Sequence, residues 1–226
     1  MNFIISLIVI FSSEMAFSSE AIGFYSGGKL KDGVSILDSG INIHKLFLSR
    51  KRFFGTQEIQ DVISDSADFV RQEYPQAELI QIGDIANKDG GICKGHSSHQ
   101  NGLDADIVYL TKNGRLQSQD APYWEEEFVK NNTVSSNFHV ERNFSLFKFL
   151  IINKSVNRIF VDAAIKKEFC SFAKKNNLMS DVETVETLRR IRVEKLHSTH
   201  FHMRINCPAT DLTCKPQAEV PIGSGC

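Results

Sequence analysis

The chain has 226 residues, with 26 Lys and Arg against 27 Asp and Glu, so its net charge is close to zero. This length is sufficient for one domain with a substantial core. The balanced charge, without a dense basic run, excludes the pattern typical of a nucleic-acid-binding protein. Seventeen Phe residues predict an aromatic-rich core rather than a disordered chain.

The N-terminus has an apolar stretch at residues 3–11, followed by small and polar residues. The stretch is too short for a transmembrane helix, and the pattern is typical of a secretory signal peptide. Ala16 and Ser18 are small residues suited to cleavage after Ser18, although no Lys or Arg precedes the apolar stretch. We therefore expect a signal peptide at 1–18, a mature domain at 19–226, and no stable membrane span after processing. The alternative is a short core element near the terminus.

The first predicted elements are a helix and two strands. Apolar residues recur at helical spacing over 56–74, with Thr56 as the N-cap and Pro75 just beyond the end. Strands are predicted at 77–83 and 104–110, and a glycine-rich loop connects them.

The remaining predicted elements are a buried apolar segment at 144–152, a strand at 157–162, a helix at 163–175, a helix from about 180 to 191 and a strand at 200–205. Ser180 and Glu183 form a capping box at the start of the second of these helices. Strands and helices interleave with short loops, which predicts an α+β fold with a mostly antiparallel central sheet and flanking helices.

The five cysteines are Cys93, Cys170, Cys207, Cys214 and Cys226. Three of them lie in the last 20 residues, where Pro and Gly are frequent. Such an irregular tail is typical of a disulfide-bonded protein from an oxidising compartment, although spacing alone does not give the pairing. A metal site in a cytosolic protein is the alternative, but the sequence has no C-x-x-C pair.

Five of the seven histidines lie in two places, GHSSHQNGLDADI and KLHSTHFHMRINC. Residues two apart on a strand share a face, so His200 and His202 are expected to point the same way. The same holds for Asp104 and Asp106 on the other predicted strand. If the two strands are neighbours, histidines and carboxylates from both converge on one point.

Two imidazoles and a carboxylate suit zinc, and three protein ligands leave a fourth position for water, as in a catalytic site. Further histidines beyond this set indicate acid–base or supporting roles. Each motif alone is a weak signal, because an isolated H-x-H is more commonly a surface feature and no H-E-x-x-H is present. The combination of the two motifs indicates a zinc site.

These two motifs closely resemble those of the penicillin-insensitive murein endopeptidases, which are periplasmic zinc peptidases. The wider group includes lysostaphin-type enzymes, D-Ala-D-Ala peptidases and the hedgehog signalling domain. The resemblance extends from about Ile22 to Cys226 and includes the stretches GKL, RFFG, FSLFK and RIFVDAAIK. It implies the fold of that group, a periplasmic location, and a metal-activated water that hydrolyses D-alanyl–meso-diaminopimelyl cross-links of peptidoglycan.

The resemblance also implies roles for individual residues. The zinc ligands are His99, Asp106 and His202. His200 acts as general base or transition-state stabiliser, and His197 is a supporting active-site histidine.

Other positions carry weaker implications. His96 matches a further active-site histidine, which is a ligand in family forms that hold extra metal. We expect Asp104 to orient the loop through hydrogen bonds and the isolated His139 to be structural or exposed. Lys130 and Thr133 stand where some members have an acid and a histidine for a second metal, so we predict one Zn²⁺ per chain.

For the cysteines, the resemblance implies disulfides Cys207–Cys214 and Cys170–Cys226. Cys93 lacks a partner, because the C-terminal extension of some members is missing. We expect Cys93 to be a small buried residue.

Two other functions stay open. A D,D- or L,D-carboxypeptidase or dipeptidase acting on muropeptide stems would need a cation to hold the terminal carboxylate. Arg204 shares the predicted strand face of His200 and His202, so it could serve. The other is a non-catalytic zinc-binding module, which would not need the surplus histidines.

Overall fold

The computed structural model describes residues 18–36 and 42–226, so the predicted signal peptide lies outside the described residues except for Ser18. Within these ranges, no helix has the length and apolar character needed to cross a bilayer. The helices are α1 (Gln57–Glu73), α2 (Val140–Asn153), α3 (Ala163–Lys175), α4 (Val182–Arg190) and the 3-10 turns η1 (Leu48–Arg50) and η2 (Leu178–Ser180).

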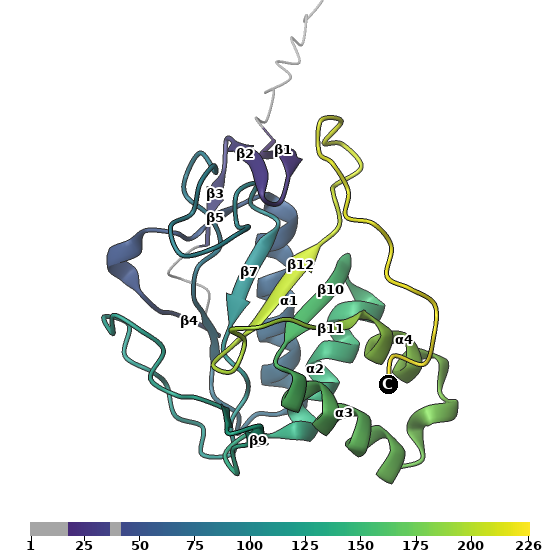
Figure 1. The fold of residues 1–226 in the computed structure, drawn as a ribbon. Coiled ribbons are helices and arrows are strands. Elements are labelled where there is room, and N and C mark those ends of the chain that lie inside the picture. The colour runs from purple at the N-terminus through teal and green to yellow at the C-terminus, as the bar shows by residue number, and fades with distance from the viewer. Residues whose placement is uncertain (1–17, 37–41) are drawn as a thin grey trace, which may run out of the picture.

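The strands are β1 (Glu20–Phe24), β2 (Gly27–Lys31), β3 (Val34–Ser35), β4 (Ile43–Lys45), β5 (Phe54–Gly55), β6 (Ile80–Ile82), β7 (Asp104–Ile107), β8 (Val129–Lys130), β9 (Thr133–Val134), β10 (Val156–Val161), β11 (Ile191–Val193) and β12 (Phe201–Ile205). Six of them form the central sheet in the order β11-β10-β12-β7-β6-β4 (Figure 1). The other described strands pair two by two at the periphery.

The central sheet is mixed. The inner pairings β10–β12, β12–β7 and β7–β6 are antiparallel, whereas the edge pairs β4–β6 and β10–β11 are parallel. The predicted α+β class is confirmed. Most pairings are antiparallel, as predicted, but the sheet is mixed because the pair at each edge is parallel. Helix α1 lies between β4 and β6 in the chain, and α3 and α4 lie between β10 and β11. A helical crossover allows the following strand to return parallel to the first.

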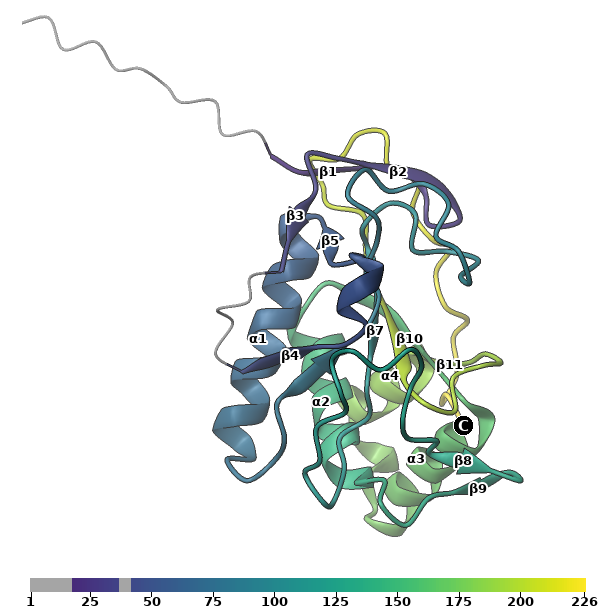
Figure 2. The same ribbon diagram turned by 90° about the vertical axis from the view of Figure 1, so that its left-hand side faces the viewer.

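The helices and the histidines occupy opposite faces of strand β12. Phe201, Met203 and Ile205 are completely buried. Phe147 of α2 packs against Phe201, with ring centroids 4.6 Å apart. Figures 1 and 2 show α1 and α2 on one side of the sheet. Because side chains alternate along a strand, His202 points to the other side, away from α2.

Most predicted elements are confirmed, with shorter strands than expected, but the predicted capping box of α4 is wrong. Ser180 ends η2, and Asp181 is the N-cap of α4. The Asp181 carboxylate accepts a hydrogen bond from the Thr184 backbone N–H at 3.1 Å. Lys148 of α2 lies 2.8 Å from Asp181 and 3.0 Å from Glu183. The neighbouring helix therefore engages the glutamate that the capping box would have used.

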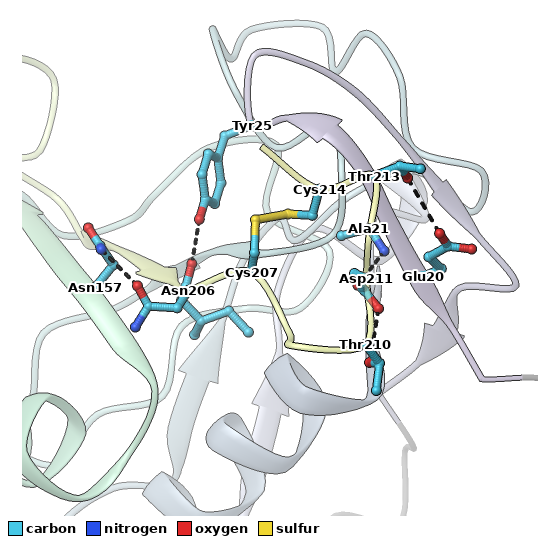
Figure 3. The surroundings of a disulfide bond; sticks show 11 residues. Glu20, Ala21, Tyr25, Asn157, Asn206, Cys207, Thr210, Asp211, Thr213 and Cys214 are labelled. Carbon is cyan, nitrogen blue, oxygen red and sulfur yellow. Dashed lines mark hydrogen bonds between the residues drawn. A yellow bond between two sulfur atoms is a disulfide. The ribbon is translucent and has the colours of Figure 1, made fainter. Parts of the chain in front are cut away.

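Two disulfides hold the C-terminal tail, with the pairing that the resemblance implies. Cys207–Cys214 closes a short loop immediately after β12 (Figure 3). Cys170–Cys226 ties α3 to the end of the chain. Cys93 is a free, buried thiol, as predicted.

Hydrogen bonds connect this disulfide loop to the start of the described chain (Figure 3). The Ala21 backbone N–H donates to the Asp211 carboxylate at 2.7 Å. The Tyr25 hydroxyl donates to the Ile205 carbonyl at 2.8 Å, at the end of β12. The strand that carries the histidines is thus fixed from both termini of the domain.

Candidate active site

The site forms where β7 and β12 lie side by side. In this antiparallel pair, His202 is opposite Asp106 and Arg204 is opposite Asp104. These four side chains therefore emerge on one face of the sheet, as the alternation in the sequence predicts. All four are buried.

His99 is held in a fixed orientation. Its backbone adopts a left-handed conformation with φ of 63°, which His tolerates better than most residues. Its N–H donates to Asp104 Oδ2 at 3.0 Å, and its Nδ1 lies 2.7 Å from the Ile85 carbonyl. Because a carbonyl only accepts, Nδ1 carries the proton in the neutral ring and Nε2 presents a lone pair. That Nε2 lies 3.2 Å from Asp106 Oδ1.

His202 and His96 repeat this arrangement with carboxylates. His202 Nε2 lies 2.9 Å from Asp104 Oδ1, and its Nδ1 lies 3.5 Å from Asp106 Oδ1. His96 Nε2 lies 2.8 Å from Asp84 Oδ2, and its Nδ1 lies 3.6 Å from Asp106 Oδ2. In each ring the inner nitrogen faces Asp106 and the outer nitrogen faces a second carboxylate. His96 Nε2 is hydrogen-bonded to Asp84, whereas His202 Nε2 is buried without a hydrogen-bond partner among the described residues.

The atoms at the centre fit a divalent metal ion. Among the described residues, His99 Nε2 and both carboxylate oxygens of Asp106 are buried without a hydrogen-bond partner. Such groups are costly to bury unless a cation compensates them. Ligand atoms of His96, His99 and Asp106 lie within 4.8 Å of one another, and His202 Nδ1 borders the same carboxylate. Imidazole nitrogens with one carboxylate are a donor set that suits zinc.

The burial of the histidines and their contacts with carboxylates also determine their protonation. Burial lowers the pKa of His200 to about 3 and that of His202 to about 4, although nearby carboxylates oppose the shift. For His99, burial also favours the neutral ring, but the charge and contact of Asp106 prevail and raise its pKa to about 9. A proton on His99 and a metal ion would therefore compete for the same nitrogen.

The two remaining histidines border this centre. His200 Nε2 lies 3.6 Å from Asp106 Oδ1, and its Nδ1 lies 2.9 Å from the Thr199 hydroxyl. His197 has its ring centroid 5.2 Å from that of His200. Its Nδ1 lies 2.7 Å from the Lys195 carbonyl. The structure thus brings five of the seven histidines together.

His139, in contrast, is the N-cap of α2. Its Nδ1 accepts a hydrogen bond from the Arg142 N–H at 3.4 Å. His139 is predicted to be structural or exposed, and this N-cap hydrogen bond is a structural contact.

Asp104 and Arg204 form a buried pair behind the ligand atoms. Arg204 Nε donates to Asp104 Oδ1 at 2.7 Å, and its Nη2 donates to Oδ2 at 3.1 Å. Arg204 Nη1 donates to Gln217 at 2.6 Å, and only 7% of the residue is exposed. Asp104 therefore orients the loop through His99, as predicted, and Arg204 is not free to hold a substrate carboxylate.

The histidines open onto a cleft of about 650 Å³. Trp124 lines it and stacks on His200, with ring centroids 4.4 Å apart and planes inclined by 15°. Phe47 meets the same indole edge-on at 4.7 Å. Motif spacing does not reveal this contact. The only signal is that Trp124 is the single tryptophan of the chain.

Comparison with known proteins identifies the family of the chain. The family model described as penicillin-insensitive murein endopeptidase matches residues 21–226. The chain belongs to this family. It is 29% identical over 216 residues to the penicillin-insensitive murein endopeptidase of Pectobacterium atrosepticum, covering 94% of this chain and 73% of that relative. The same enzyme of Haemophilus influenzae is 29% identical (91% and 70% covered), and that of Escherichia coli O157:H7 is 30% identical (92% and 74% covered).

We expect Asp104→Asn to lower the free energy of unfolding by about 3 kcal/mol, because it leaves the buried Arg204 guanidinium without a counter-charge. Urea denaturation measures this. The control is Lys31→Met, which removes a pair in which Lys31 is 58% exposed, and it should change stability by less than about 1 kcal/mol. Equal stabilities of the two variants would contradict the role given to Asp104.

We expect Gly83→Ala to displace the indole from His200, because an added Cβ would lie 2.5 Å from Trp124 Cη2. The emission maximum of this single tryptophan should shift, with a loss of stability of about 1–3 kcal/mol from overpacking. Gly27→Ala is the control, since a Cβ there meets no atom within 4 Å. An unchanged emission spectrum in the Gly83 variant would show that the stack does not depend on this glycine.

Proposed function

We propose that the protein is a zinc-dependent endopeptidase that hydrolyses D-alanyl–meso-diaminopimelyl cross-links of peptidoglycan in the periplasm. Family membership supports a peptidase that acts on murein. The observation that carries the proposal is the convergence of unpartnered ligand atoms from His99 and Asp106, beside His202, at the base of an open cleft. Two disulfides and the signal-peptide pattern at 1–18 support export.

His99 Nε2, the Asp106 carboxylate and His202 Nδ1 would hold the ion, with His96 beside them. A zinc ion bound there supplies a Lewis acid, which lowers the pKa of water and polarises a carbonyl. The Ile85 carbonyl and the Asp84 carboxylate fix the rings of His99 and His96, and the Asp104 carboxylate lies 2.9 Å from His202 Nε2, so the ligand set is preorganised.

His200 is the residue that we assign to proton transfer. Burial keeps its imidazole neutral near pH 7, which is the form that accepts a proton from the attacking water. The Thr199 hydroxyl and the Trp124 ring hold it beside the ligand cluster. The proton then passes to the leaving amine as the amide bond breaks.

His197 is the residue that we assign to charge stabilisation. The Lys195 carbonyl accepts from Nδ1–H, so the imidazolium form of His197, with Nε2 also protonated, is the form that would donate to the developing negative charge on the substrate oxygen. The Tyr109 hydroxyl donates to the His197 carbonyl at 3.0 Å and anchors this segment.

The alternatives receive less support. A carboxypeptidase that used Arg204 would have to break a buried double hydrogen bond to Asp104. A non-catalytic zinc module would gain nothing from His197 and His200 at the mouth of the cleft.

The proposal predicts the behaviour of His200→Ala toward purified cross-linked muropeptide dimers. The parent protein should contain one zinc per chain and convert dimers to monomers. His200→Ala should retain the zinc and lose about 10²–10⁴-fold in kcat/KM, the range for a general acid–base. Metal analysis and chromatography of the products measure both quantities.

His139→Ala is the control, because it removes a histidine outside the cluster, and it should keep both zinc and activity. Digestion of monomeric pentapeptides alone would reject the endopeptidase in favour of a carboxypeptidase. Normal cleavage of dimers by His200→Ala would refute the role of His200.

A further inference from the structure

We propose that Arg52 and Lys94 form a binding site for a substrate carboxylate at one end of the cleft. The inference rests on the proposed function and names the part of the cross-link that this end of the cleft recognises. The ligand is the free carboxylate of the diaminopimelyl residue whose amino group forms the scissile amide.

This end of the cleft carries an excess of positive charge. Arg50, Arg52 and Lys94 all line it, together with His96. The carboxylate in contact with the two arginines is Asp84, whose side chain is 2% exposed. A single buried carboxylate cannot balance three cations, so the surface presented to the cleft is cationic.

The hydrogen bonds show which cation is already engaged. Arg50 donates from Nη1 to Asp84 at 3.0 Å and from Nη2 to the Pro122 carbonyl at 2.7 Å. Its guanidinium also stacks over the Phe47 ring at 3.7 Å. Arg50 is therefore a fixed part of the wall, and it positions Asp84.

Arg52 and Lys94, in contrast, have donors to spare. Arg52 uses Nη1 for both Asp84, at 3.1 Å, and the Lys94 carbonyl, at 2.9 Å. In the described part of the chain, no partner is found for Arg52 Nη2 or for the exposed Lys94 ammonium. A planar guanidinium with a neighbouring ammonium is well suited to a carboxylate, because charge-assisted hydrogen bonds are the strong ones.

A tight turn keeps these cations close to the ligand cluster. The His96 N–H donates to the Cys93 carbonyl at 3.0 Å, and Gly95 has a φ of 94°, in the region that favours glycine. Lys94 is thus held two residues from His96, whose Nδ1 is 3.6 Å from Asp106. The cationic site adjoins the place where the amide is cut.

The chemistry of the cross-link matches this arrangement. The amide nitrogen is attached to a carbon of diaminopimelate that also bears a free carboxylate, so carboxylate and scissile bond are close neighbours. Glu194 and Lys195 also line the cleft, but their charges are of opposite sign, so together they add no net positive charge that would compete for the carboxylate. Binding the carboxylate at Arg52 and Lys94 therefore fixes the direction in which the cross-link lies, with its amine side toward His96.

The test compares two cross-linked dimers that differ only at this carboxylate, which is free in one and amidated in the other. Lys94→Met should lower kcat/KM for the free-carboxylate dimer by roughly tenfold and for the amidated dimer by less than about twofold. Lys88→Met is the matched control, because it removes an exposed lysine of the same loop that does not line the cleft. It should leave both values unchanged.

Binding supplies a second readout. Calorimetry in the His200→Ala background should show the same tenfold selective loss of affinity when Lys94→Met is added. Equal use of both dimers by the parent protein, or an equal loss for both in Lys94→Met, would overturn the carboxylate site. If the parent cleaves neither dimer, the proposed function fails, and calorimetry alone then decides whether the carboxylate is bound.

Discussion

The arrangement of the histidine cluster depends on one buried carboxylate, that of Asp106. Asp106 is 1% exposed, and ring nitrogens of His96, His99, His200 and His202 lie within 3.2–3.6 Å of its oxygens. This arrangement is costly for an isolated anion, because burial removes its water. The surrounding imidazoles hold the pKa of Asp106 far below its usual range and keep it charged. A charged oxygen facing several lone-pair nitrogens is the condition that attracts a divalent cation.

The rest of the fold serves to aim these groups. The antiparallel pairing of β7 and β12 places His202 opposite Asp106, and the helices cover the other face of the sheet. An outer set of groups faces the rings, and its two carboxylates, Asp104 and Asp84, are themselves anchored. Arg204 holds Asp104, and Arg50 and Arg52 hold Asp84. The Cys207–Cys214 loop follows β12 directly and joins it to the first described strand. The same ion pairs and disulfide loop therefore stabilise the fold and position the histidines.

The sequence predicts this centre well and its surroundings poorly. Strand alternation correctly placed Asp104 with Asp106, because a period of two leaves little choice once a strand is assigned. Asp84, Arg50 and Arg52 have no such signal. The two arginines lie next to left-handed backbone at Phe47 and Lys51, which no hydrophobic pattern encodes. The parallel edge strand β4 is only three residues long, too short for periodicity to reveal it. Ser180 and Asp181 are both good N-caps, and Lys148 on another helix favours the second.

The most direct test of the metal centre is a structure from crystals grown with zinc. Anomalous diffraction data are collected on both sides of the zinc absorption edge. We expect one strong anomalous peak per chain, coordinated by the imidazoles of residues 99 and 202 and the carboxylate of residue 106. A peak bound elsewhere, or no peak at this carboxylate at saturating zinc, would contradict the assignment of the metal centre.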